Sequence, residues 1–146
     1  MSLHALATVL AIVLGHPHAN PELLRYAAEA VERDDSPMFG GQDHELAVAI
    51  TWAAHESHLV ADPKPLSKDA RAGASHGVLQ QRLVLPLRDQ FRAWLATLHK
   101  ASKMCGGDEA GLRMISSGYC DRASDLVKSR LNEAYFAIEL VKPDTP

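Results

Sequence analysis

The sequence lacks any concentration of positive charge. Its 146 residues include 15 Lys and Arg against 18 Asp and Glu, which gives a formal net charge of -3, and the basic residues form no run. Binding to nucleic acid needs a cationic surface that displaces counterions from the phosphates. We therefore expect no nucleic-acid partner.

Long hydrophobic runs are also missing. The apolar stretch over residues 3–14 is too short to span a bilayer, which takes about 20 residues. No Lys or Arg precedes it, as would be usual in a signal peptide. We expect no membrane span and favour a buried first helix over a cleaved signal, while the route of export stays open.

Cysteine is scarce, because Cys105 and Cys120 are the only two. They are compatible with two small buried thiols or with a disulfide that closes the segment between two helices. Two cysteines alone are weak support for an oxidising compartment. Both interpretations remain open at the level of the sequence.

The chain shows no internal repeat, no linker and no sustained alternation of polar and apolar residues. Its length is that of one domain, and 47% hydrophobic and 23% charged residues are ordinary for a globular protein. We predict an all-α fold in a single domain, 1–146, with at most a small hairpin in the long loop over residues 62–77.

Helices are predicted from capping residues and from apolar spacing. Asn20 and Pro21 are a typical helix start, and Gly106 is a typical stop. The expected helices cover residues 3–14, 21–33, 43–57, 87–105, 108–116 and 122–141. The last helix is expected to bury Leu126, Val127, Leu131, Ala134, Tyr135 and Ile138.

Three segments carry the chemistry. Residues 52–57 read Trp-Ala-Ala-His-Glu-Ser, residues 74–80 read Ala-Ser-His-Gly-Val-Leu-Gln, and residues 114–119 read Met-Ile-Ser-Ser-Gly-Tyr. In this order they resemble the motifs of the lytic transglycosylase family and its goose-type lysozyme relatives. The match covers about residues 43–140. It departs from the family at Ala74-Ser75, where Gly-Ala is usual, and at Ile115-Ser116, where Tyr-Asn is usual.

The resemblance implies a lysozyme-like fold and cleavage of the MurNAc-GlcNAc β-1,4 bond of peptidoglycan. It makes Glu56 the catalytic acid and implies an enzyme that works as a monomer, without a metal or cofactor, in the cell envelope or outside the cell. The segments that match the family motifs supply the expected substrate contacts, namely Ser75, Gly77, Gln80, Ser116, Gly118 and Tyr119.

Physical chemistry supports the role of Glu56. Breaking a glycosidic bond requires a proton on the leaving oxygen, so the donor must stay protonated near neutral pH. A carboxyl at the end of an alanine-rich helix, one turn after Trp52, can be partly desolvated, which raises its pKa. Gly77 lets the backbone approach a sugar, and Gln80 offers both a donor and an acceptor.

Only one carboxyl stands in a motif position. Glu56 can complete the reaction alone if its carboxylate then takes the proton of the sugar's own 6-hydroxyl, and the product then has a 1,6-anhydro end, as the resemblance to lytic transglycosylases implies. The runner-up is hydrolysis, with a water held by Asp62 or Asp69 of the long loop.

Three other interpretations stay open. His55 and His58 share a helix face at i, i+3, but no third ligand is placed by spacing, and we favour surface histidines over zinc ligands. The altered third segment is compatible with a module that binds glycan without cleaving it. The domain could also act within a larger wall-puncturing assembly of a phage tail, although no extra domain is visible.

Overall fold

The computed structural model describes residues 1–59, 78 and 85–142, and this part of the chain is helical without a strand. The all-α prediction is thereby confirmed, while the possible hairpin over 62–77 lies outside the described residues. The helices are α1 (Leu3–Val13), α2 (Pro21–Glu32), α3 (Gln42–Ser57), α5 (Leu87–Cys105), α6 (Asp108–Ser117) and α7 (Asp125–Val141).

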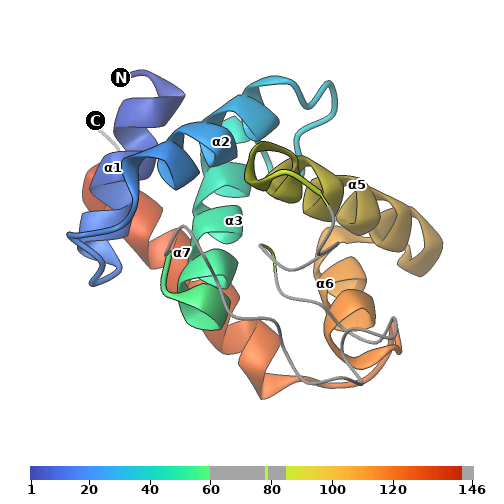
Figure 1. Cartoon of the computed structure of the whole chain (residues 1–146). Helices are drawn as coiled ribbons and strands as arrows, with labels where there is room; N and C mark the ends of the chain where they lie inside the picture. Colours follow the sequence, from blue (N-terminus) through green and yellow to red (C-terminus); the bar gives the residue numbers. More distant parts are fainter. Residues whose placement is uncertain (60–77, 79–84, 143–146) are drawn as a thin grey trace.

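Helix α3 runs through the centre of the molecule, with α1, α2 and α7 around it (Figure 1). All of its residues from Glu45 to Ala54 are buried. Its alanines allow close approach of the neighbouring helices, and a helix buried all round shows no single apolar stripe. The helix ends at Ser57, because His58 adopts the left-handed conformation with a φ of 56°.

The first two helices begin at side-chain caps. Ser2 accepts the backbone N–H of Ala5, and Asn20 accepts those of Glu22 and Leu23. Helix α1 contributes four residues to the core, so the expected packing of this segment is present; they are Leu6, Ala7, Leu10 and Ala11.

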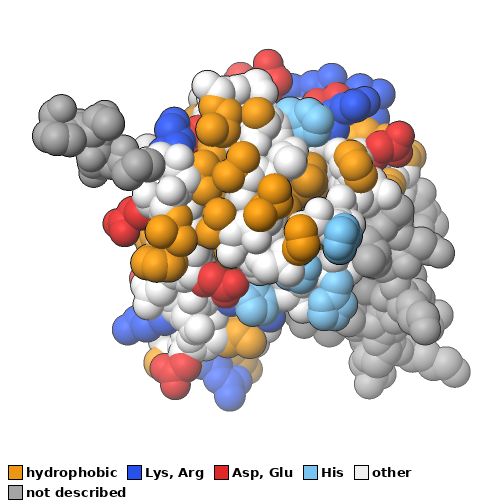
Figure 2. All heavy atoms as spheres, turned by 90° about the vertical axis from the view of Figure 1, so that its left-hand side faces the viewer, with side chains coloured by type: hydrophobic (Ala, Val, Ile, Leu, Met, Phe, Trp, Pro, Cys, Tyr) orange, Lys and Arg blue, Asp and Glu red, His pale blue; other side chains and the backbone are white. Residues whose placement is uncertain are grey.

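The other face of α1 is partly open to solvent. Ile12 is 53% exposed, and hydrophobic side chains gather on this side of the molecule (Figure 2). No helix in the described part of the chain is both long and apolar enough to cross a membrane.

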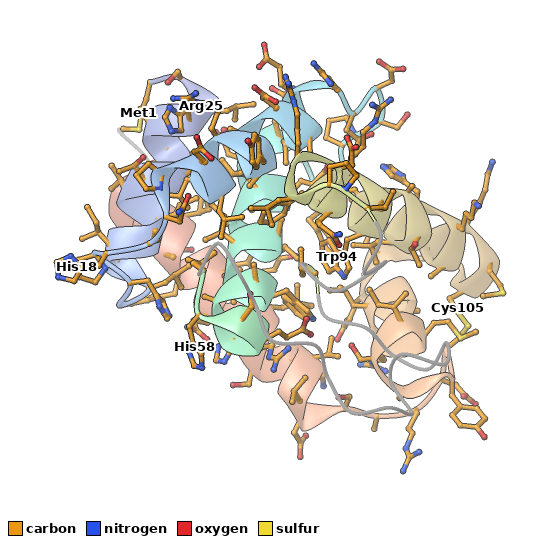
Figure 3. The ribbon with its side chains drawn as sticks, in the orientation of Figure 1. Met1, His18, Arg25, His58, Trp94 and Cys105 are labelled. Carbon is orange, nitrogen blue, oxygen red and sulfur yellow. A yellow bond between two sulfur atoms is a disulfide. The ribbon has the colours of Figure 1, made fainter. Side chains whose placement is uncertain are left out.

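A disulfide joins the end of α5 to the loop after α6. Cys105 and Cys120 are bonded, with their Cα atoms 5.4 Å apart (Figure 3). Of the two interpretations that the sequence left open, the bonded one therefore holds. Between these cysteines, Gly111 packs so closely that an added Cβ would lie 2.6 Å from the backbone nitrogen of Ser102 on α5.

The predicted core face of α7 is wrong at Leu126, and Tyr135 is only half-buried. Leu126 is 49% exposed, whereas Val127, Leu131 and Ile138 are buried. The buried residues recur at intervals of three and four from Val127, and Leu126 falls beside this stripe. The helix also begins later than expected, at Asp125, because the Ser124 side chain accepts the N–H of Val127.

Candidate functional site around Glu56

Glu56 lies in the last turn of α3, and its side chain is 24% exposed. Its Oε2 accepts the backbone N–H of Val78 at 2.8 Å, across 22 residues of sequence. The end of the central helix and Val78 of the second segment therefore meet at this point, as the pairing of the two segments in the sequence predicts.

Helix α7 supplies a cation to the site. The Nη1 of Arg130 lies 3.4 Å from Oε1 of Glu56, and the guanidinium carbon lies 5.6 Å from the centroid of the Trp52 ring. Trp52 is 1% exposed, so the Arg130 guanidinium makes a cation–π contact with a buried aromatic ring. Both oxygens of the Glu56 carboxyl thus have a donor, one from backbone and one from a side chain.

Burial dominates the electrostatics of Glu56. Desolvation raises its pKa above the ordinary value of 4.5, against the opposing effects of the Val78 N–H and the Arg130 guanidinium. Glu56 consequently keeps its proton to a higher pH than a solvated glutamate does. A general acid needs this property to protonate a leaving oxygen.

The two histidines that flank Glu56 have different partners. The Nε2 of His55 lies 2.7 Å from Oε2 of Glu133 on α7, and both side chains are well exposed. The His58 ring, at the end of α3 in Figure 3, lies 6.4 Å from the ring of His16 between centroids.

The predicted residues of the third segment lie at the end of α6. Ser116 is half-buried in the helix, and Gly118 ends it with a φ of 85° and a bond from its N–H to the carbonyl of Met114. Tyr119 is 61% exposed. The other predicted contacts and the two loop carboxylates lie outside the described residues; they are Ser75, Gly77, Gln80, Asp62 and Asp69.

Sequence reasoning missed Arg130. It precedes Leu131, a core residue of α7, so its side chain lies at the edge of the buried stripe. The position of Arg130 at the edge of an apolar helix face was the only indication of its role in the site. This indication becomes useful only once α7 is known to pack on α3.

A second cluster of ionisable side chains was also missed. Asp34, Glu45 and His99 offer ligand atoms that all lie within 4.8 Å of one another. Burial and the neighbouring Asp34 raise the pKa of Glu45 to about 9. Burial alone would raise the pKa of Asp34 too, but hydrogen bonds with Glu45 and His99 outweigh it and lower that pKa below 3.8.

Comparison of the chain with protein-family models, with curated proteins and with solved structures finds no match.

Proposed function

We propose that this protein has a lysozyme-like fold and cleaves peptidoglycan glycan strands at the MurNAc-GlcNAc β-1,4 bond, as a lytic transglycosylase. The observation that carries the proposal is the Glu56 carboxyl, which is mostly buried, held by the Val78 N–H, and raised in pKa by desolvation. The resemblance of the three sequence segments adds the substrate class.

Glu56 acts twice in this reaction. Its proton passes to the glycosidic oxygen as the bond from that oxygen to the anomeric carbon breaks. The carboxylate then takes the proton of the 6-hydroxyl of the same MurNAc residue, whose oxygen bonds to the anomeric carbon. The products are a free 4-hydroxyl on one fragment and a 1,6-anhydro ring on the other, and no water is consumed.

The neighbours of Glu56 support both halves of the cycle. Desolvation keeps the acid protonated before bond cleavage. The Arg130 guanidinium and the Val78 N–H stabilise the carboxylate that exists between the two proton transfers. A carboxyl that is stabilised in both forms can serve first as acid and then as base.

We also propose that the protein works in the cell envelope or outside the cell, as a monomer. The disulfide between Cys105 and Cys120 supports this location, because such bonds persist mainly in oxidising compartments. The substrate is found there as well.

Digestion of purified peptidoglycan, followed by mass spectrometry of the released fragments, tests the proposal. The wild-type protein should release fragments with 1,6-anhydro ends, which are lighter than reducing ends by one water. Glu56→Gln should lower the rate by about 10²- to 10⁴-fold. Glu139→Gln, which changes an exposed carboxylate of α7, is the matched control and should keep the wild-type rate.

Three results would contradict the proposal in different ways. Full activity of Glu56→Gln would remove Glu56 as the acid. Reducing ends alone would indicate hydrolysis instead of the anhydro reaction. Co-sedimentation of folded wild-type protein with peptidoglycan, without release of fragments, would indicate a glycan-binding module.

A further inference from the structure

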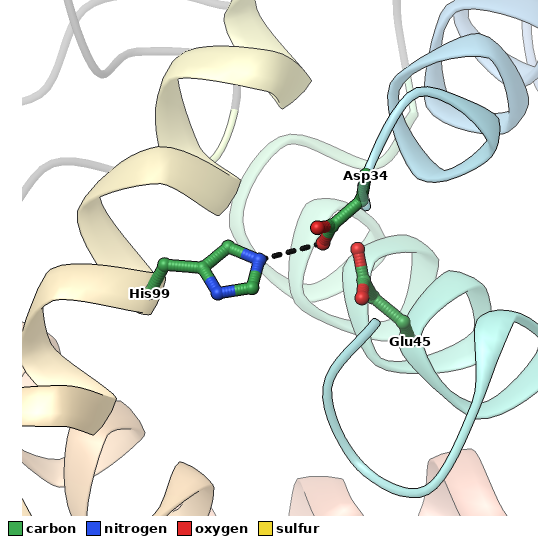
Figure 4. A group of neighbouring side chains, drawn as sticks. All are labelled: Asp34, Glu45 and His99. Carbon is green, nitrogen blue, oxygen red and sulfur yellow. Dashed lines mark hydrogen bonds and ion pairs between the residues drawn. The ribbon is translucent and has the colours of Figure 1, made fainter. Parts of the chain in front are cut away.

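Three ionisable side chains converge near the start of α3, at the opposite end of that helix from Glu56. Asp34 follows α2, Glu45 lies in the first turn of α3, and His99 projects from α5 (Figure 4). Glu45 and Glu56 are 11 residues apart on one helix, which corresponds to about 16 Å along its axis. This cluster is therefore separate from the candidate catalytic site.

Backbone donors fix the two carboxyl groups. Oδ1 of Asp34 accepts the N–H of Ser36 at 3.0 Å, and Oε2 of Glu45 accepts the N–H of Met38 at 2.6 Å. The Nε2 of His99 lies 2.6 Å from Oδ2 of Asp34. One oxygen of each carboxylate is thus held by the loop between α2 and α3, which leaves the second oxygen directed at the cluster.

The second oxygen of Glu45 accepts no hydrogen bond from the described residues, and the hydrogen bond between Glu45 and Asp34 needs a proton between the two carboxyl groups. Glu45 is 0% exposed, and its Oε1 is buried. In Figure 4 its carboxylate lies beside that of Asp34. Two adjacent buried carboxylates are costly unless a proton or a cation lies between them.

We propose that Asp34, Glu45 and His99 bind a divalent zinc ion. One imidazole nitrogen and two carboxylate oxygens form a ligand set that zinc accepts in proteins, whereas calcium and magnesium prefer oxygen ligands alone. The His99 side chain is 34% exposed, so the fourth position faces solvent and can take a water. On binding, Nε2 of His99 exchanges its contact with Asp34 for the metal.

The bound ion connects three helical elements of the fold. It links the end of α2 and the start of the buried central helix to α5, and it takes the place of the proton between Glu45 and Asp34, which is released to solvent. The proposal does not depend on the glycan-cleaving activity, because the cluster lies at the other end of α3.

Calorimetric titration of the full chain with Zn²⁺, after treatment with a chelator and its removal, is the direct test. We expect one ion per chain and a melting temperature that rises with the zinc concentration. Ca²⁺ and Mg²⁺ should bind more weakly.

Two variants localise the site. His99→Gln and Glu45→Gln should each weaken zinc binding by at least about tenfold. Circular dichroism confirms that each variant is folded, and His99→Gln changes a side chain that is partly exposed, so it should leave the core intact. The double substitution of His16→Gln and His58→Gln is the matched control, since it removes a neighbouring pair of histidines elsewhere.

Two results would overturn the proposal. Absence of zinc binding by the folded wild-type protein would show that a proton alone lies between the two carboxyl groups. Binding that is unchanged in His99→Gln but lost in the His16 and His58 double variant would place the metal on the other histidines.

Discussion

Arg130 on α7 and Glu56 on α3 form an ion pair of 3.4 Å across the packed interface of two helices. The guanidinium lowers the pKa of Glu56, against the larger effect of burial. Arg130→Leu should therefore raise this pKa further. In a pH–rate profile of glycan cleavage, the decline that marks loss of the acidic proton should move to higher pH.

The same substitution should also lower the maximal rate, because the carboxylate formed after the first proton transfer loses a stabilising charge. Arg122→Leu, outside the helix and exposed, is the control. An unchanged profile for Arg130→Leu would show that the ion pair has no influence on the acid.

Glu56 should contribute to the pH dependence of stability. Its pKa is raised in the folded state, so its favourable contribution is complete below the unfolded value of 4.5 and is lost as pH rises through the folded pKa. Glu56→Gln should abolish this pH-dependent loss of stability, because glutamine does not ionise. Its melting temperature should exceed that of the wild type at pH 8 and converge with it near pH 4. Equal melting temperatures at both values would contradict the raised pKa.

Reduction of the disulfide should destabilise the protein. The bond between Cys105 and Cys120 closes a loop of 15 residues, for which the loop-entropy model gives about 3 kcal/mol. Urea unfolding of the double Cys→Ser variant should show a loss of this size. Intact-mass measurement after alkylation without reductant should find no modified thiol in the wild type, and two alkylated thiols there would refute the bond.

Gly111 offers a test of the contact between α5 and α6. An alanine Cβ there would lie 2.6 Å from the nitrogen and 2.8 Å from the Cα of Ser102. These are backbone atoms, which cannot move aside as the end of a flexible side chain can. We expect Gly111→Ala to cost about 1–3 kcal/mol in thermal or urea unfolding. Gly107→Ala is the matched control, because a Cβ there has nothing within 4 Å. Equal stability of the two variants would show that the helices are not in this close contact.

Local chemistry made most of the helices predictable. Asn20 and Pro21 start α2, and Gly106 ends α5, because capping depends only on neighbours in the sequence. The error at Leu126 has the opposite origin. An apolar residue one position away from the buried stripe cannot be told from a core residue until the packing partner of the helix is known.

The candidate site was predictable only in part, for a related reason. Glu56 and Val78 were expected to meet because two sequence segments suggested their pairing. Arg130 is 74 residues from Glu56, and His99 is 65 residues from Asp34. No periodicity links such positions, since the packing of whole helices brings them together.

The disulfide between Cys105 and Cys120 also determines how the chain responds to tension. When the protein is pulled from its two ends, the bond carries the load past α6, and residues 106–119 do not lengthen the unfolded chain. The 15 Cα-to-Cα steps from Cys105 to Cys120 would otherwise extend to about 50 Å, so the fully unfolded molecule should be shorter by about 45 Å while the bond is intact. Helix α6 lies within the closed loop and bears no tension, so it can unfold without lengthening the chain.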